Sequence, residues 1–409
     1  MNRFKILVII LLWPLSLIAG HKILHPQIKS LQAVVNQDFM SPAVLRLGTD
    51  DVLHIAFDEL SHDYHRYTYT LERCEADWTP AQGLFESDWL EGFNAIVIDD
   101  HEPSINTIVP YTHYQLQIPN DQCRLKMSGN YRLFIIDDEQ HEKLACVEFM
   151  VTDQTMSLFM EATTNTDIDL NTSHQQLSLS LNYNGLNVTN PQEQIRMVVR
   201  QNDRDDNCCR DVTPTFVNAN GLRWQHCRQL IFDAGNEYHK YEVLDPSHPT
   251  MGIDYIRWDG EQYQVFPFIN EPRPNYIYDE DANGAFYIRN SDNRENETIS
   301  EYLWVNYRLK APRLPFGQIL IQGMWTVEDP ETYVMTYDET TQLYTARILQ
   351  KQGYYSYQYL WQDHEGHLQF LPSEGSFYQT ENRYQAYIYY KGTGERTWRL
   401  VGYRQLIFK

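Results

Sequence analysis

One string in the chain has residue types and a spacing that suit a metal ion. Residues Asp279-Glu280-Asp281-Ala282-Asn283-Gly284 match the first half of a calcium-binding loop, D-x-D-x-N-G, in which side-chain oxygens ligate the cation. The match then fails, because the twelfth position is Asn290 where a bidentate Glu is needed, and residues 285–288 have the pattern of a strand. We therefore interpret the string as a turn between strands and predict no metal site.

Arrangements that could perform catalysis are equally sparse. The sequence contains neither the G-x-S-x-G nucleophile elbow nor a glycine-rich phosphate loop. Cys74 has His62 and His65 nearby in sequence, but a cysteine within a strand is more often packed than reactive. Adjacent carboxylates such as Asp50-Asp51 point to opposite faces of a strand and make a poor acid–base pair. We predict that the protein is not an enzyme and uses no cofactor; an unrecognised hydrolase site is the weaker alternative.

Six cysteines leave two interpretations open. Disulfides are permitted outside the cytoplasm, but the sequence does not fix their connectivity, and buried free thiols are an equal alternative. A metal centre is the least favoured, because no Cys-x-x-Cys or Cys/His pairing has the required spacing. The residues concerned are Cys74, Cys123, Cys146, Cys208, Cys209 and Cys227.

A first group of aromatic residues lies in a loop-like stretch between two expected strands. Trp78, Trp89 and Phe93 are its members. Loops on a rigid sandwich commonly carry binding residues, so these three are the residues we predict to contact a partner protein if the group is a binding site. The alternative, a satellite core that fills the space beneath a long loop, is slightly favoured.

A second aromatic group lies near the end of the chain. Tyr355, Tyr357 and Tyr359 alternate and share one face of an expected strand, with Trp325 and Trp361 close by in sequence. If the rings are exposed, Trp325 and Trp361 can stack on sugar rings; if they are buried, the group is core, which is the favoured interpretation.

The elements that position these residues are strands almost everywhere. Apolar residues alternate with polar ones, as in Leu53, Ile55 and Phe57, and Asp, Asn and Gly separate the runs. The 29 Tyr residues favour strands over helices. We predict an all-β fold of tandem antiparallel β-sandwich domains, immunoglobulin-like or E-set-like. The expected strands cover residues 52–57, 67–74, 114–119, 131–136, 145–152, 176–183, 195–200, 262–269, 285–289, 302–309, 318–322, 333–337, 343–349, 354–361 and 386–390.

The chain divides into a leader and three expected domains. Arg3 and Lys5 precede a short apolar run that ends in Ala19 and Gly20, which is typical of a secretory signal peptide; an uncleaved anchor is the weaker alternative. Residues 1–20 are thus the signal peptide, followed by an N-terminal β-sandwich at 21–153, a middle β-rich domain at 154–312 and a C-terminal E-set-like sandwich at 313–409. The last boundary rests on two prolines within residues 311–315. The polar stretch 201–210 is expected to be a solvated loop.

Charge and hydropathy limit the partners. The formal net charge is −22, which repels nucleic-acid phosphates and anionic lipids, so we predict no nucleic-acid partner. Apart from the leader, no apolar stretch is long enough to span a bilayer, and we predict no direct membrane span. We expect a protein that is exported beyond the cytoplasm and acts by binding.

Several strings, taken together in order and spacing, resemble the plug protein of the type IX secretion system of Bacteroidetes. The resemblance extends over nearly all of the chain after the leader. It departs from the commoner His-Cys-Asn-Ala-Asp-Trp form at Arg73 and Glu75. The strings are Cys74-Glu75-Ala76-Asp77-Trp78, Trp89-Leu90-Glu91-Gly92-Phe93-Asn94, Tyr111-Thr112-His113-Tyr114, Pro119-Asn120, Ser128-Gly129-Asn130-Tyr131, Gly235-Asn236-Glu237, Gly353-Tyr354-Tyr355-Ser356-Tyr357-Gln358-Tyr359 and Glu374-Gly375-Ser376-Phe377-Tyr378.

The resemblance implies a periplasmic protein at the inner face of the outer membrane. Its partner would be the giant outer-membrane β-barrel translocon of the type IX system, whose periplasmic mouth it would close at rest. The family has no catalytic residues to transfer. The last region also resembles E-set modules found beside sugar-processing enzymes, so an exported glycan-binding protein is the alternative function.

Overall fold

Alternating apolar and polar residues form strands throughout the chain. The computed structural model describes residues 20–409, and within them each of the three α-helices is four residues long. The predicted all-β fold of packed antiparallel sheets is confirmed. The predicted signal peptide lies outside the described residues, apart from Gly20.

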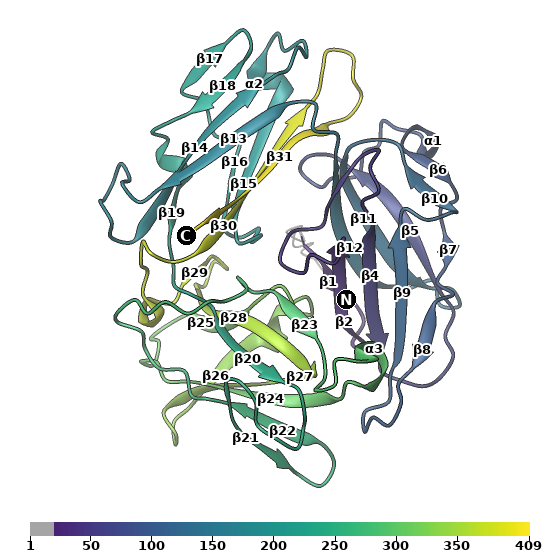
Figure 1. Cartoon of the computed structure of the whole chain (residues 1–409), viewed down its shortest axis with the longest axis vertical. Helices are drawn as coiled ribbons and strands as arrows, with labels where there is room; N and C mark the ends of the chain where they lie inside the picture. The colour runs from purple at the N-terminus through teal and green to yellow at the C-terminus, as the bar shows by residue number, and fades with distance from the viewer. Residues whose placement is uncertain (1–19) are drawn as a thin grey trace, which may run out of the picture.

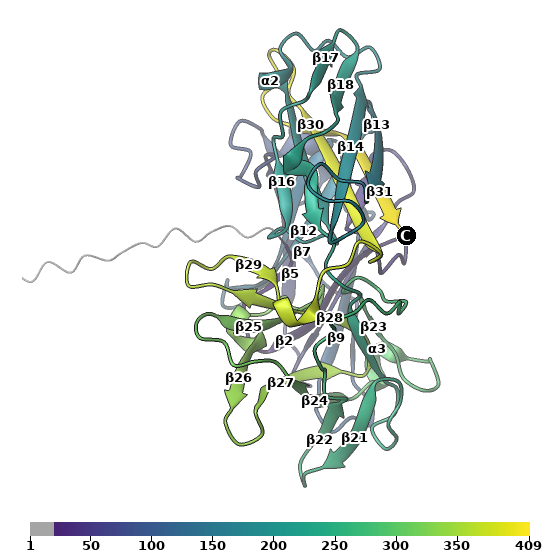
Figure 2. The same ribbon diagram turned by 90° about the vertical axis from the view of Figure 1, so that its left-hand side faces the viewer.

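The strands form three modules, which we name by position (Figure 1). The middle module and the third module follow one another along the longest axis, and the N-terminal module lies beside both (Figures 1 and 2). Residues 20–153 form the N-terminal module, residues 156–234 with 382–408 form the middle module, and residues 239–380 form the third module.

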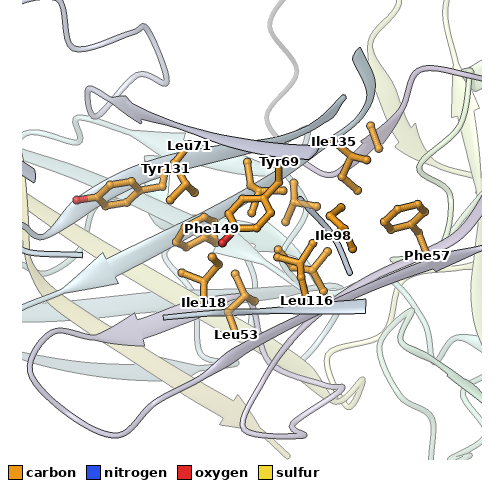
Figure 3. Packing of buried hydrophobic residues seen from close by; sticks show 14 of the residues in the cluster. Leu53, Phe57, Tyr69, Leu71, Ile98, Leu116, Ile118, Tyr131, Ile135 and Phe149 are labelled. Carbon is orange, nitrogen blue, oxygen red and sulfur yellow. The ribbon is translucent and has the colours of Figure 1, made fainter. Parts of the chain in front are cut away.

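The N-terminal module is a sandwich of two sheets. Leu53 and Ile118 on one sheet face Leu71, Tyr131 and Phe149 on the other (Figure 3). Because successive strand residues point to opposite faces, every second residue of these strands enters this core. One sheet is β2 (Ile28–Val35), β4 (Leu53–Glu59), β9 (Thr112–Ile118) and β8 (His101–Pro103); the other contains β12 (Lys143–Thr152), β11 (Gly129–Asp137), β5 (Tyr67–Cys74) and β7 (Ile96–Val97), with β1 (Lys22–Ile23) and β3 (Val44–Arg46) on β12. At one end lie α1 (Glu86–Trp89), β6 (Leu90–Gly92) and β10 (Cys123–Leu125).

The middle module is a second sandwich, and its core lies between two sheets. Leu177, Leu179 and Leu181 of one sheet share this core with Met197 and Ile388 of the other. The first sheet contains β13 (Ser157–Thr163), β14 (His174–Asn182), β18 (Gly221–Trp224), β17 (Phe216–Asn218) and β19 (Ile231–Asp233); the second contains β16 (Cys208–Arg210), β15 (Ile195–Gln201), β30 (Asn382–Tyr390) and β31 (Arg399–Phe408). Through the parallel pair β31–β12 this second sheet continues into the sheet of β12, β11, β5 and β7 in the N-terminal module, and together they form one ten-stranded sheet. The short helix α2 (Pro191–Gln194) connects β14 of the first sheet to β15 of the second, and η1 (Arg228–Leu230) connects β18 to β19 within the first sheet.

The third module is one ten-stranded sheet that folds over on itself. Ile319 and Tyr357 from one end of the strand order share a core with Val305 and Ile348 from the other. In order the strands are β20 (His239–Val243), β28 (Gly353–Gln362), β25 (Gln318–Gln322), β26 (Val334–Asp338), β27 (Leu343–Lys351), β24 (Tyr302–Leu309), β22 (Tyr263–Pro267) and β21 (Ile253–Trp258), with β23 (Phe286–Ile288) and β29 (Leu368–Phe370) on β28. Short helices α3 (Asn296–Ile299), η2 (Pro330–Tyr333) and η3 (Pro372–Glu374) lie in its loops.

The grouping of strands into sheets differs from the predicted division at residue 312. β24 pairs with β27 along its whole length, although the two strands lie on opposite sides of that position. The hairpin β30–β31 leaves the third module and pairs with β15 of the middle module. The prolines of residues 311–315 mark only the connection from β24 to β25, where Ala311 is buried in the core of the third module.

Candidate functional site

The calcium-like string is a turn that leads into β23, as predicted. The carboxylates of Asp279 and Asp281 already have partners within the protein, whereas the buried side-chain amide of Asn283 has none. The Asp281 carboxylate accepts hydrogen bonds from the backbone N–H groups of Tyr238 and Asn283, and the Lys240 ammonium lies 2.6 Å from an Asp279 oxygen. Burial, with nearby Glu237, raises the pKa of Asp281 to about 7.

A metal-type group of three side chains does occur elsewhere in residues 20–409. Asp363, Glu365 and His367 lie in the turn between β28 and β29, and the last two are exposed. The His367 ring is 3.2 Å from the Asp363 carboxylate, so the histidine itself pairs with the acidic residues. This exposed group provides no reason to assign a metal.

All six cysteine thiols are free in the structure, which matches the alternative of unpaired thiols. Burial raises the pKa of Cys74 and of Cys146 to about 12, and that of Cys123 to about 11. Because the thiolate is the reactive form, these three thiols are poor nucleophiles at neutral pH.

The first aromatic group is split by the fold. Trp78 is 4% exposed and packs between the N-terminal and middle modules, and Trp89 is 6% exposed in the N-terminal core. Phe93 is 70% exposed, and Phe85 nearby is 75% exposed. Leu84, Glu86 and Trp89 help to line a hollow of ≈ 380 Å³, and the Glu86 carboxylate accepts a hydrogen bond from Asn94, which follows Phe93 in the chain. Of the three residues predicted to contact a partner, only Phe93 presents its ring to solvent.

The second aromatic group belongs to the core of the third module. Trp325 is 7% exposed; its Nε1–H donates to the Ser356 carbonyl at 2.9 Å, and its ring meets that of Tyr355 edge-on at 5.6 Å. Trp361 is half-buried and packs against Phe316. A sugar ring therefore cannot stack on Trp325 in this arrangement, and the core interpretation describes the group.

The polar stretch 201–210 is not a solvated loop, and that prediction is wrong. Its charges pair with one another: Arg200 lies 3.0 Å from Asp205, and Arg204 pairs with Asp206 at 2.5 Å. Arg204 is buried, and the Arg200 guanidinium lies over the Tyr387 ring. Charge pairing of this kind allows a polar segment to be buried.

A buried charge network joins the N-terminal module to the third module. The Lys351 ammonium lies 2.6 Å from Asp58 Oδ2, and the Tyr302 hydroxyl donates to the same oxygen at 2.6 Å. His113 Nδ1 is 2.7 Å from Asp58 Oδ1, and Lys351 also lies over the Tyr111 ring at 4.0 Å. Burial alone would raise the pKa of Asp58, but Lys351 and His113 lower it below its ordinary value.

A second joint connects the N-terminal and middle modules. The Arg73 guanidinium donates to the carbonyls of Ser128 and Trp398, at 2.8 and 2.5 Å. The Tyr389 hydroxyl donates to the Asn130 side chain at 2.9 Å. Apolar residues around Trp78 fill the rest of this contact.

The middle and third modules are joined by two connecting segments that bind each other. The Gly235 N–H donates to Ser376 Oγ at 3.0 Å, and the Asn236 side chain donates to the Glu374 carbonyl at 2.7 Å. Each pair of modules thus has its own polar joint, and the three modules form a closed arrangement.

Comparison with known proteins identifies the family. The family model described as the type 9 secretion system plug protein 1st domain matches residues 28–153. The chain aligns with the crystal structure of a hypothetical protein from Parabacteroides merdae ATCC 43184 at 34% sequence identity. The alignment covers 95% of this chain and 99% of the Parabacteroides chain, and the two structures superpose with a TM-score of 0.92. The chain belongs to the type IX secretion system plug family.

Other comparisons add nothing to this assignment. A second alignment is with the C-terminal domain of the Streptococcus pyogenes antigen I/II-family protein AspA, at 8% sequence identity. It covers 93% of this chain and 100% of the AspA domain, but its TM-score of 0.15 carries no argument. No curated protein matches the chain. Within residues 20–409, no helix has the length and apolar character needed to cross a bilayer.

Members of the plug family are components of a secretion system, and membership assigns this chain to the cell envelope and to contact with other components of that system.

Sequence reasoning missed the residues that form the joints, among them Asp58, Tyr302 and Lys351. Their partners are up to 293 positions apart, so no local pattern could pair them. The strings that carry the family resemblance nevertheless include joint residues: Tyr111 and His113 lie at one joint, and Gly235 and Ser376 at another.

Proposed function

We propose that this chain is the periplasmic plug of the type IX secretion system, and that it closes the periplasmic mouth of the outer-membrane β-barrel translocon in its resting state. Membership of the plug family supports this role. The observation that carries the proposal is the closed arrangement of three modules, each joined to the other two. In this role the protein acts by occupying space, without a chemical step.

A plug has to resist deformation, and the joints provide for that. The joint at Asp58 buries a charge pair whose separation would leave Lys351 uncompensated, so opening it is costly. Close-packed sandwich cores add resistance, because such interiors are hard to compress. A body of this kind can block an opening without being threaded through it.

A reversible seal also needs a moderate, partly polar interface, as transient complexes have. We propose that exposed Phe93 is one contact with the translocon; it lies beside exposed Phe85 and the hollow described above. The Phe93→Ser variant leaves the core intact because the ring is not packed inside, so its effect reports contact with a partner.

The direct test of the proposed partner is affinity isolation from outer membranes of cells that carry the tagged chain. We expect a very large β-barrel protein to co-purify with the wild-type chain, and a smaller yield with Phe93→Ser. As the matched control, Phe159→Ser removes a ring that is 54% exposed, against 70% for Phe93, from the middle module and leaves the yield unchanged. Absence of any β-barrel protein from the wild-type isolate would contradict the proposal.

A further inference from the structure

The outer face of the third module's sheet is only partly covered. On β24 and β27, outward-facing residues alternate with core residues, because strand side chains alternate between the two faces. At one end of this face, Tyr302, Leu349 and Lys351 are covered by Val109 and Tyr111 of the N-terminal module. The same face therefore already serves as a docking surface within the chain.

Beyond that contact the face continues over β27, β24, β22 and the edge strand β21 without a covering module. We call it the Arg–aromatic face. Three aromatic rings and three arginines alternate on it. The residues are Tyr255, Arg257, Phe266, Trp304, Arg308 and Arg347.

The rings and guanidinium groups of this face are in contact. Tyr255 and Phe266 stack at 4.3 Å between centroids. The Arg347 guanidinium lies 4.2 Å from the Trp304 ring centre, and those of Arg257 and Arg308 each lie 5.6 Å from that of Phe266. Such stacking holds the guanidinium groups in place, which reduces the entropy lost when they bind a ligand.

Two of the three arginines are available for a carboxylate. Arg308 is already paired with Asp254 at 2.8 Å. Within the part of the chain that the structure describes, Arg257 and Arg347 have no carboxylate within ion-pair distance, and both are exposed. Asp259 attracts Arg347 without reaching ion-pair distance. In a chain with a net charge of −22, these two exposed guanidinium groups are cationic sites on an aromatic platform.

The chemistry of this face selects its ligand. Guanidinium groups bind carboxylates in a two-pronged geometry, and Arg, Trp and Tyr are the residues enriched where protein partners bind. Sugars are disfavoured because Arg347 covers the Trp304 ring face on which a sugar would stack. Nucleic acid and anionic lipid present extended anionic surfaces that meet the negative charge of the whole molecule, whereas a short acidic segment contacts only this face.

We propose that the Arg–aromatic face binds an acidic, extended segment of the translocon on its periplasmic side. This proposal rests on the proposed plug function and specifies its contact. The edge strand β21 forms a ladder only with β22. β20 contacts its start, where the Glu242 N–H donates to the Met251 carbonyl; beyond that point the other edge of β21 offers backbone groups to an added strand, and the arginines bind the acidic side chains. Carboxylates on the segment then complete the pairs that Arg257 and Arg347 lack.

The first test uses a fluorescein-labelled peptide of ten glutamates and the purified chain at low salt. Fluorescence anisotropy is expected to show binding to the wild-type chain, and binding about tenfold weaker or more to the double variant Arg257→Glu/Arg347→Glu. The control Arg223→Glu changes an exposed arginine on the middle module and leaves binding unchanged. Equal binding by the wild-type chain and the double variant, or no binding by either, overturns the proposal.

The second test identifies the contact in membranes by photocrosslinking from benzoylphenylalanine at position 255. The expected adduct is an acidic peptide of the barrel protein, and it is lost in the double variant. An adduct to a neutral or basic peptide, or full retention of the barrel by the double variant, overturns the assignment of this face while leaving the plug function standing. If the wild-type chain retains no barrel protein, the plug function is refuted. The peptide measurement then tests separately whether the Arg–aromatic face binds an acidic segment.

Discussion

At the scale of single residues, the carboxylate of Asp58 does the most to hold two modules together. It accepts from Tyr302 and Lys351 of the third module and lies beside His113 of its own module. A buried ion pair adds little net stability compared with an apolar pair of the same shape, but removing one partner is strongly destabilising. The network therefore makes the joint specific and costly to disturb.

We predict that Asp58→Asn lowers the free energy of unfolding by about 3–5 kcal/mol, because Lys351 stays buried without a counter-charge. Urea unfolding followed by near-ultraviolet circular dichroism measures the change. Glu339→Gln, which breaks the exposed pair with Arg313, is the control and is expected to have little effect. The double variant Asp58→Asn/Lys351→Met should regain much of the loss. An effect of Asp58→Asn no larger than that of the control would refute the role of this network.

Residue roles were the hardest part to predict from the sequence. Trp78, Trp89 and Phe93 have the same local signature of aromatic residues between strands, yet two of the rings are buried and one is exposed. Whether a ring in a loop is buried depends on which other module covers that loop, and the residues of that module lie far away in the sequence. Arg200 and Arg204 show the same limitation, since a charge run predicts solvation unless its pairing partners are known.

At the scale of elements, local patterns predicted most strands well. The expected strands at 67–74, 302–309 and 318–322 coincide with β5, β24 and β25. Strand β2 was missed because Ser30 has a φ of 51° and the register shifts between Lys29 and Gln32, which interrupts the alternation. Strand β31 was also missed; it contains Gly402 and has a register shift against β30.

Sheet membership could not be predicted, because it depends on pairings between distant segments. The prolines near residue 312 indicated a boundary, whereas β20 to β24 and β25 to β29 form one sheet. The chain passes between the middle module and the third module twice, at residues 235–238 and at residue 381. Prolines that interrupt a strand pattern do not indicate which sheet the next strand joins.

We predict that residues 235–381 fold as an independent module and that residues 313–409 do not. The shorter fragment lacks β24, the neighbour of β27, and keeps β30 and β31 without β15. Cooperative urea unfolding and dispersed amide proton signals are the measurements. Cooperative unfolding of 313–409, together with an unfolded 235–381, would show that this grouping of strands is incorrect.

At the scale of the whole molecule, the three joints decide the behaviour. Each module has its own core, and each is joined to the other two by polar contacts. Motion of one module then requires at least two joints to open together. Family membership assigns the chain to the type IX secretion system, and the three joints make it a body that resists deformation.

The central claim is that the folded chain closes the translocon. Its most direct test is the conductance of the translocon barrel reconstituted in a planar bilayer, with the purified chain added to the periplasmic side. The account predicts that the open-channel current falls to the closed level, that adding the chain to the opposite side has no effect, and that Arg257→Glu/Arg347→Glu raises the concentration needed for closure. An unchanged current at saturating concentrations of the folded wild-type chain would contradict the account.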